Sequence, residues 1–359
     1  MDRQIIATGV FVVAAMTAIL SFFLSFVSAR LARRLGALDQ PDGDRKIHVK
    51  PTPLFGGTGV AVSILAAVVL LYVNGLLQNI SARQVLGFAI AVLILLIGGI
   101  TDDKRARPPL LQIIFPILAA TVVIISGTGI QQVTNLSAGG GFSLVWWKSP
   151  AFITSHYAIS LPADLITLLW LLFATYATKL LDGLDGLVAG IAVIGSAMVG
   201  ALTLSPAYFQ PAVALLSGGI GGAFLGFLPR NINPAKQFLG EAGSTLAGFS
   251  LGFLAIVSSA KVAIALSVLA IPLADAAFVV LGRLRRGVSP WKGDATHLHF
   301  RLLQSGIPHG TTVVLLWGAC LSAGVIALSL QTRGKIFLVA TLAVATAMSS
   351  WLIGRYGKR

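Results

Sequence analysis

The chain has 359 residues, of which 56% are hydrophobic and 11% are charged. Soluble domains carry roughly a quarter charged residues, so this composition excludes an ordinary soluble protein and indicates a polytopic membrane protein. The single cysteine, Cys320, excludes an intrachain disulfide and a thiolate metal cluster. The net charge of +14 is explained first by membrane orientation and then by anionic lipid or phosphate ligands, before nucleic acid.

Apolar runs recur along the chain at lengths close to those that cross a bilayer, about 17 to 25 residues. The eleven runs are residues 4–29, 55–76, 85–100, 110–126, 161–178, 187–204, 209–228, 244–258, 262–281, 312–330 and 336–353. The first run lacks a small-residue cleavage pattern at a convincing place, so we interpret it as a retained helix. We therefore predict an all-α polytopic membrane protein of about 11 transmembrane helices, forming one domain over residues 1–359.

Lysine and arginine divide unequally between the alternate gaps. Twenty of the 26 fall on one side, and the other six are Arg3, Arg83, Lys148, Lys261, Arg333 and Lys335. By the positive-inside rule, the N-terminus is outside and the C-terminus is cytoplasmic. Nine of the twelve acidic residues lie on the same basic side. This crowding predicts cytoplasmic active-site loops at residues 30–54, 101–109, 179–186, 229–243 and 282–311.

The longest external gap, residues 127–160, contains a glycine run followed by Phe142, Trp146 and Trp147. This pattern predicts a small hairpin or an interfacial patch with the tryptophans at the lipid headgroups. We assign no catalytic role to it.

The first cytoplasmic loop, residues 42–53, is basic and leads into Gly56 and Gly57 at the start of the second run. Backbone N–H groups near a helix start commonly hold anions, which makes the loop, with Lys50, a candidate phosphate site. The alternative is a charge run that only sets orientation, and the loop alone favours that alternative.

Two adjacent acids, Asp102 and Asp103, end the third run. Adjacent carboxylates repel one another, so they suggest a divalent cation or a shared proton. Mg²⁺ in particular binds one or two carboxylates together with substrate phosphates. The alternative is a helix end neutralised by the following bases, but acids are unfavourable at a helix C-terminus.

The segment 179–187 joins the fifth and sixth runs and carries Asp182 and Asp185, each followed by glycine. A carboxylate beside hydrocarbon is costly unless it meets a cation, a donor or water. A solvated turn is an equally good interpretation of this segment alone. Because five loops on this side carry polar groups, we favour a site for a phosphorylated, metal-bound ligand at the lipid boundary.

Two later loops add candidates. Glu241 begins the eighth run, where a carboxylate could simply complement the helix dipole. Phe238 could stack on a base or anchor the membrane interface. His297 and His299 are spaced unsuitably for one zinc ion, and the surrounding arginines, including Arg301, favour phosphate binding over metal.

Taken in order, these motifs resemble the polyprenyl-phosphate N-acetylhexosamine-1-phosphate transferases of glycosyltransferase family 4, over about residues 42–308. The resemblance implies transfer of a HexNAc-1-phosphate from a UDP-sugar to polyprenyl phosphate at the cytoplasmic face, and GlcNAc-1-phosphate is the group that it favours. It also implies release of UMP and Mg²⁺ as cofactor, with Mn²⁺ as a substitute. The His297-Leu298-His299 loop is more similar to the undecaprenyl-phosphate GlcNAc-1-phosphate transferase branch, which starts lipopolysaccharide O-antigen, teichoic acid or arabinogalactan linkages, than to peptidoglycan translocases.

The resemblance also implies residue roles. It places Asp102 at the lipid phosphate, which it would orient or deprotonate, and Asp185, Lys50 and Phe238 at the uracil. The catalytic set is Asp102, Asp103 and Asp182. The nucleotide- or sugar-binding set is Lys50, Lys179, Asp185, Asn231, Phe238, His297, His299 and Arg301. The metal ligands are Glu241 and Asp102.

Two departures from the family pattern bear on activity. Tyr176 and Lys179 stand where two asparagines are usual, and Glu241 stands for a metal-binding aspartate. Lys179 could contact the diphosphate, or it could pair with Asp182 or Glu241 and take the metal's place. The alternative functions are therefore weak or lost catalysis, or another donor such as UDP-MurNAc-pentapeptide.

The implied location is the bacterial inner membrane, with the bilayer as a partner and no nucleic acid. The glycines at 218, 219, 221 and 222 permit close helix packing within one chain or in a homodimer. A transporter is disfavoured because, apart from Asp164 at the start of the fifth run, Asp275 is the one acid inside an apolar run, and no internal repeat is evident.

Overall fold

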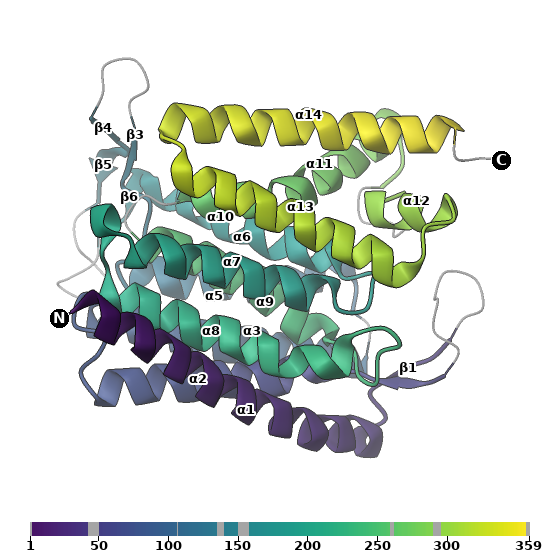
Figure 1. Cartoon of the computed structure of the whole chain (residues 1–359), viewed down its shortest axis with the longest axis horizontal. Helices are drawn as coiled ribbons and strands as arrows, with labels where there is room; N and C mark the ends of the chain where they lie inside the picture. Colours follow the sequence, from purple (N-terminus) through teal and green to yellow (C-terminus); the bar gives the residue numbers. More distant parts are fainter. Residues whose placement is uncertain are drawn as a thin grey trace.

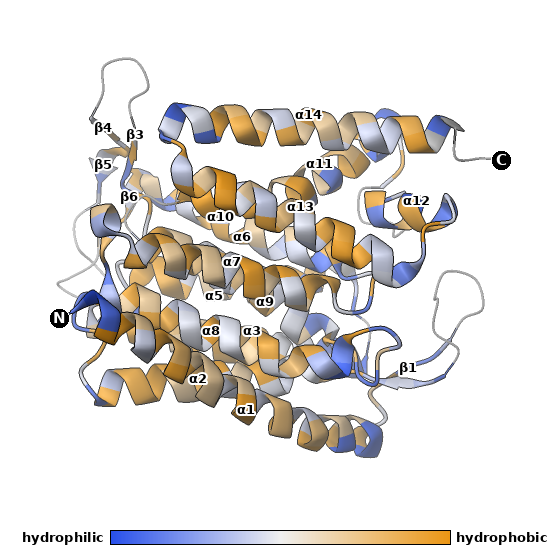
Figure 2. Ribbon diagram, in the orientation of Figure 1, coloured by the Kyte–Doolittle hydropathy of each residue, from blue (hydrophilic) through white to orange (hydrophobic). Residues whose placement is uncertain are grey.

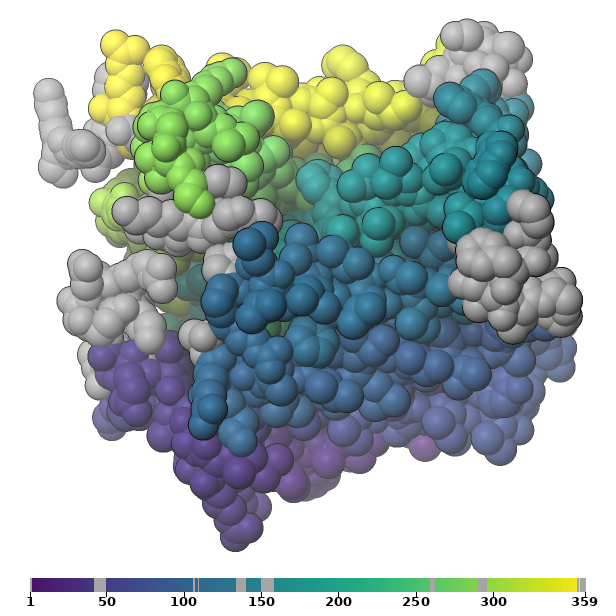
Figure 3. Space-filling model, turned by 180° about the vertical axis from the view of Figure 1, so that it is seen from behind, coloured from purple at the N-terminus to yellow at the C-terminus, as the bar shows by residue number. Residues whose placement is uncertain are grey.

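The structure, a computed structural model, describes residues 2–41, 50–105, 107–134, 140–149, 158–258, 262–289 and 296–356. Long helices lie side by side along a common direction, with short strands at their two ends (Figure 1). Seen from behind, the N-terminal and C-terminal helices form opposite edges of the molecule (Figure 3). The predicted all-α architecture is confirmed.

Every predicted apolar run lies on a helix or on a pair of helices. The longer helices are α1 (Arg3–Leu35), α2 (Gly56–Val73), α3 (Ala82–Lys104), α5 (Ile114–Ile125), α6 (Ala163–Leu181), α7 (Leu187–Leu204), α8 (Pro211–Asn231), α9 (Gly240–Val257), α11 (Ala270–Arg285), α13 (His309–Ser329) and α14 (Thr332–Tyr356). The shorter ones are α4 (Pro109–Gln112), the 3-10 helix η1 (Pro206–Tyr208), α10 (Val262–Val268) and α12 (Leu298–Gln304).

Nine helices in the described part of the chain are long and apolar enough to cross a membrane. A tenth span results if α10 and α11, which meet at a 69° bend, cross together. The fourth predicted run forms a shorter apolar helix, Leu110–Ile125. A count of eleven spans therefore stays a prediction, as does the orientation.

Burial differs sharply among the spans. In α9, 89% of the apolar window is buried, whereas the corresponding share in α14 is 11%. Hydrophobic residues dominate the middle of the helices and hydrophilic residues gather at their ends (Figure 2). Because a helix in lipid satisfies its own backbone groups, exposed apolar side chains on the outer helices suit contact with hydrocarbon. The central helix α9 is the element around which the others pack.

Short strands lie at both ends of the bundle. At the end where α1 finishes, β1 (Leu38–Asp39) pairs antiparallel with β2 (Thr52–Pro53). At the other end, β3 (Gln132–Thr134) pairs with β4 (Gly141–Ser143), and β5 (Val145–Lys148) pairs with β6 (Ser160–Pro162). The small hairpin predicted within residues 127–160 is therefore present as the antiparallel pair β3 and β4, and β5 forms a second antiparallel pair with β6. Trp146 and Trp147 are exposed, as an interfacial patch requires.

Helices α2 and α3 approach the start of α9 at backbone contact. A Cβ atom added to Gly99 would lie 2.2 Å from backbone atoms of Ala242, and one added to Gly57 would lie 2.1 Å from the nitrogen of Gly243. These distances are far below any van der Waals contact, so only glycine fits at both positions. The packing fixes the end of α3 beside Glu241.

We expect Gly99→Ala to destabilise the protein by about 1–3 kcal/mol, because the new methyl group must push α3 away from α9. The matched control is Gly282→Ala on α11, where an added Cβ meets nothing within 4 Å. The control should be neutral or slightly stabilising, since alanine favours helix. Thermal unfolding in detergent measures both variants. Equal stability of the two would contradict the packing argument.

Candidate active site

Polar side chains from several helix ends meet at the end of the bundle that carries β1 and β2. Helix α3 contributes Asp102 and Asp103 in its last turn, and α6 contributes Lys179 in its last turn. Helix α9 begins with Glu241 close to them, and the loop between α6 and α7 adds Asp182 and Asp185. The predicted acids therefore converge in one region, although they come from distant parts of the chain.

Asp103 connects α3 to the start of α9. Its Oδ1 atom accepts a hydrogen bond from the Glu241 N–H at 2.8 Å, which satisfies an otherwise unpaired group at the helix start. Gly240 has a positive φ of 72°, and a Cβ there would lie 2.6 Å from Asp103 Oδ2. That Oδ2 atom is buried and has no hydrogen-bond partner in the described residues. An orphaned carboxylate oxygen is costly unless a ligand or proton meets it.

Lys179 and Gln112 link Glu241 to Asp102. The Lys179 ammonium lies 2.5 Å from Glu241 Oε1 and donates to Gln112 Oε1 at 2.7 Å. Gln112 in turn donates to both carboxylate oxygens of Asp102, at 3.3 and 3.2 Å, and the Arg107 N–H donates to Asp102 at 2.9 Å. Asp102, predicted as base and metal ligand, is thus held by neutral donors. Sequence reasoning missed Gln112, whose only signal was a polar residue near the start of an apolar run.

Asp185 ties three segments together. Its Oδ2 atom accepts hydrogen bonds at 3.0 Å from the Asn233 side chain and from the Ala235 N–H. Its own N–H donates to His309 Nε2 at 3.2 Å, at the start of α13. Asn231 Oδ1 accepts the Gly186 N–H at 3.1 Å. Asp185 and Asn231 therefore order the loop itself, and His309, which the sequence analysis did not select, belongs to the same network.

Asp182 is the C-cap residue of α6, and its side chain is accessible to solvent. Its partial removal from bulk water, followed by repulsion from Glu241 and Asp185, raises the pKa of Asp182 to about 7. Asp182 therefore changes its protonation state near neutral pH.

The predicted uracil-binding residues lie on neighbouring segments. The Phe238 N–H donates to the Pro53 carbonyl at 2.9 Å, and the Phe238 carbonyl accepts the Gly56 N–H at 3.1 Å. These bonds hold the segment that follows Lys50 against the start of α9. Lys50 is exposed, and the structure gives no contact between it and Asp185. The candidate phosphate loop at residues 42–49 lies outside the described residues.

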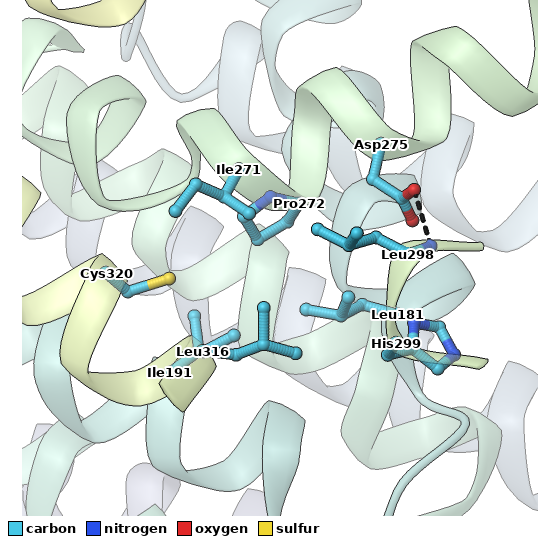
Figure 4. Close-up of a pocket in the computed structure, with 9 residues that line it drawn as sticks. All are labelled: Leu181, Ile191, Ile271, Pro272, Asp275, Leu298, His299, Leu316 and Cys320. Carbon is cyan, nitrogen blue, oxygen red and sulfur yellow. Dashed lines mark hydrogen bonds between the residues drawn. The ribbon is translucent and has the colours of Figure 1, made fainter. Parts of the chain in front are cut away.

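His297 and His299 are buried, with 5% and 0% of their surfaces exposed. His297 Nδ1 hydrogen-bonds to Asp275 Oδ2 at 2.8 Å, and the Leu298 N–H donates to Asp275 Oδ1 at 2.7 Å. Asp275 thus caps α12 from helix α11, across a small pocket that His299 also lines (Figure 4). In the sequence, Asp275 was notable only as an acid inside an apolar run. Its location within an apolar run was the signal, because such acids seldom lack a partner.

The two histidine rings stack, with centroids 5.6 Å apart. Burial and then the neighbouring His297 ring lower the pKa of His299 to about 3, so His299 is neutral at physiological pH. A Cβ added to Gly183 would lie 2.6 Å from His299 Nε2, so this ring packs directly on the loop between α6 and α7. Both ring nitrogens of His299 lack hydrogen-bond partners in the described residues.

Arg301 anchors α12 rather than facing the loop acids. Its Nε atom donates to the Thr296 carbonyl at 2.6 Å, and its Nη1 atom donates to the Ser350 carbonyl of α14. The guanidinium of Arg301, predicted to bind an anion, therefore forms hydrogen bonds to backbone carbonyls within the protein. The neighbouring base Lys292 and acid Asp294 lie outside the described residues.

The donors do not fit a resident Mg²⁺ as they stand. Within the described ranges, no group of three or more His, Cys, Asp or Glu side chains is arranged to hold a metal ion. Glu241 is paired with Lys179, and Asp102 accepts from Gln112 and Arg107. The remaining donor is the orphaned Asp103 oxygen. Mg²⁺ at this site stays a prediction from the resemblance, and we assign no reaction step to it.

We expect Asp275→Ala to lower the free energy of unfolding by about 1–3 kcal/mol, because His297 and the Leu298 N–H both lose their acceptor. Asp275→Asn keeps one acceptor oxygen and should cost less. Chemical denaturation in detergent micelles measures both. If Asp275→Ala unfolds like the wild type, the cap contributes nothing to the docking of α12.

Asp182 gives a pH dependence with a definite sign. Because its folded pKa of about 7 exceeds the usual 3.8, protonation favours the folded state. The stabilisation of the folded state by protonated Asp182 is complete below about pH 4 and is lost as the pH rises through about 7. In EDTA, the unfolding temperature of wild type relative to Asp182→Asn should therefore fall between pH 4 and 8. A constant or rising difference would show that the carboxylate is not destabilised by its surroundings.

Comparison with known proteins agrees with this geometry. Residues 85–259, which contain the acids of α3, α6–α7 and α9, match the model of glycosyl transferase family 4. The chain is 27% identical to a probable undecaprenyl-phosphate N-acetylglucosaminyl 1-phosphate transferase of Bacillus subtilis, over 88% of this chain and 82% of that protein.

Other relatives have similar names. The chain is 27% identical to a decaprenyl-phosphate N-acetylglucosaminephosphotransferase of Mycolicibacterium smegmatis, over 94% of this chain and 86% of that protein. It is 25% identical to an undecaprenyl-phosphate alpha-N-acetylglucosaminyl 1-phosphate transferase of Escherichia coli, over 81% of this chain and 76% of that protein. The family motif residues, the helical membrane architecture and these matches agree: residues 85–259 match glycosyl transferase family 4, and this multi-pass membrane enzyme is similar over most of its length to polyprenyl-phosphate N-acetylglucosaminyl 1-phosphate transferases.

Proposed function

We propose that this enzyme transfers GlcNAc-1-phosphate from UDP-GlcNAc to a polyprenyl phosphate at the cytoplasmic membrane face and releases UMP. The observation that carries the proposal is the convergence of Asp102, Asp103, Asp182, Asp185 and Glu241 at one end of the bundle. The relatives' names support the acceptor and the transferred group. The excess of Lys and Arg on that side supports a cytoplasmic location.

The reaction forms one phosphorus–oxygen bond and breaks another. An oxygen of the lipid phosphate attacks the phosphorus that bears the sugar, and the bond from that phosphorus to the UMP oxygen breaks. UMP leaves with the electron pair, and the product is a lipid-linked diphosphate sugar. Such a transfer needs in-line positioning and neutralisation of charge more than covalent chemistry.

We place the acceptor phosphate beside the end of α3. A small pocket between α3, α4, α5 and α9 is lined there by Asp102, Arg107, Gln112 and Glu241, together with apolar residues such as Leu95 and Phe115. A polyprenyl chain could leave such a pocket through lipid while its phosphate stays near the cationic side chains. Asp103, with its unpaired oxygen, is the group best placed to receive a proton or orient the phosphate.

We place the donor nucleotide at the loop between α6 and α7. Asp182 is accessible there, and Asp185 is anchored to the neighbouring loop at Asn233 and Ala235. Lys179 supplies positive charge between this loop and Glu241. We place the diphosphate near Lys179 and Asp182, and the uracil toward Phe238. The lipid-linked product would start a cell-envelope glycan in the bacterial inner membrane.

A second candidate function is a family member with weak or lost catalysis. The Lys179–Glu241 ion pair favours it, because it occupies two positions at which the chain departs from the family pattern. Such a protein would bind nucleotide or lipid phosphate without turnover. The same assay separates the two functions.

The assay uses detergent-purified protein with undecaprenyl phosphate, labelled UDP-GlcNAc and Mg²⁺, and measures UMP release that depends on the lipid. Asp103→Asn should lower the rate about 10²–10³-fold, the usual cost of removing a group that acts in the transition state. Asp2→Asn is the matched control: Asp2 caps α1 at its N-terminal end, a role that asparagine also fills. Its rate should equal that of the wild type.

Wild-type protein that releases no UMP from any UDP-HexNAc, although it binds UDP-GlcNAc, would favour the second candidate. Equal rates for Asp103→Asn and wild type would instead show that Asp103 has no role in the reaction, and Asp102 would then be the candidate for that role.

A further inference from the structure

We propose that the Lys179 ammonium is a built-in cation that occupies the divalent-ion position at Glu241, and that a metal ion binds there only after displacing it. The inference rests on the proposed function for its catalytic meaning. Its structural basis is the position of one lysine among the carboxylates of α3, α9 and the α6–α7 loop.

The ammonium is held from several sides. Glu241 Oε1 lies 2.5 Å from Lys179 Nζ and Gln112 Oε1 lies 2.7 Å from it, so two of its three N–H donors have partners. The ring of Tyr176 lies on another side, with its centroid 5.3 Å away, within the range of a cation–π contact. The side chains of Lys179 and Glu241 are 16% and 18% exposed. Lys179 is thus fixed, while one donor remains for a ligand.

A metal ion and this ammonium exclude one another. A Mg²⁺ ion binds carboxylate oxygen at about 2.0–2.1 Å, and this requires the space next to Glu241 that Lys179 Nζ now fills. The two cations also repel, and at a short distance in a partly buried site that repulsion is not screened as it is in water. Binding of a metal at Glu241 therefore carries the cost of breaking the ion pair and moving the lysine.

The surrounding network supports the lysine in this place. Gln112 accepts from Lys179 through its carbonyl oxygen and donates through its amide to Asp102, so both ends of the amide are oriented. Asp102, Asp103 and Glu241 repel one another electrostatically. Within the described residues, Lys179 is the cation that forms an ion pair with one of these acids, Glu241. Removing the lysine leaves the Glu241 carboxylate without its cation, so that its negative charge becomes available to a divalent ion.

For the proposed reaction, a tethered ammonium would provide part of the positive charge that the donor diphosphate requires. Lysine acts as a compact charge with rotatable donors, which suits non-bridging phosphate oxygens. The remaining N–H of Lys179 is the group that would reach them. The positive charge of Lys179 would then be present at any metal concentration, whereas a site that depends on a free metal ion would need that ion to bind.

The test is metal binding by the full-length protein in detergent, without substrate, with Mn²⁺ as the probe and free Mn²⁺ measured by electron paramagnetic resonance. Lys179→Asn should bind Mn²⁺ at least about tenfold more tightly than wild type, because a repelling charge and a competitor are removed together. Adding Glu241→Gln to Lys179→Asn should abolish the gain. Lys179→Arg, which keeps the cation, should bind like the wild type.

The matched control is Lys148→Asn, which removes one exposed charge from β5 at the other end of the bundle and should leave Mn²⁺ affinity unchanged. Glu241→Gln alone provides a second measurement if the Lys179 variants fail to fold. It should not change Mn²⁺ binding, because Glu241 is already occupied by Lys179. Wild-type protein that binds Mn²⁺ as tightly as Lys179→Asn, with binding lost in Glu241→Gln, would overturn the proposal. Since no substrate is present, absence of transferase activity would not affect this result.

Discussion

The close approach of α3 to the first turn of α9 is the constraint on which the candidate site depends. Glycines at 57 and 99 let backbone meet backbone, and Asp103 then accepts the Glu241 N–H. Because α9 is the most buried span, its first residue is a fixed reference point for the charges around it. Any separation of α3 from α9 would leave a buried helix start without its acceptor.

The charges at this site are balanced by neighbours from other helices. Lys179 comes from α6 and Gln112 from α4, and together they join Glu241 to Asp102. His309 from α13 and the segment around Asn233 hold the Asp185 loop. Asp275 from α11 caps α12 and holds His297. The contacts of Lys179 and Asp185 join elements far apart in the sequence, so the network forms only when the whole bundle has assembled.

The chain's two departures from the family pattern are coupled in space. Lys179 and Glu241 are 62 positions apart, yet their side chains form one ion pair. Glutamate is longer than aspartate by one methylene, and its carboxylate meets the ammonium of the lysine on α6. A change that looked unfavourable for a metal ligand therefore has a direct structural partner.

Periodicity and composition by themselves determined the helical membrane architecture, because continuous apolar runs of about 20 residues with charged ends cross a bilayer as helices. The order of Asp102, Asp182, Asp185 and Glu241 also indicated one site. What the tertiary structure alone decided was pairing: which cation meets which acid, that Arg301 is used by α12 and α14, and that Gln112, Asp275 and His309 take part. Such contacts depend on helix packing at ångström scale, and no local pattern in the sequence encodes the distance between side chains of different helices.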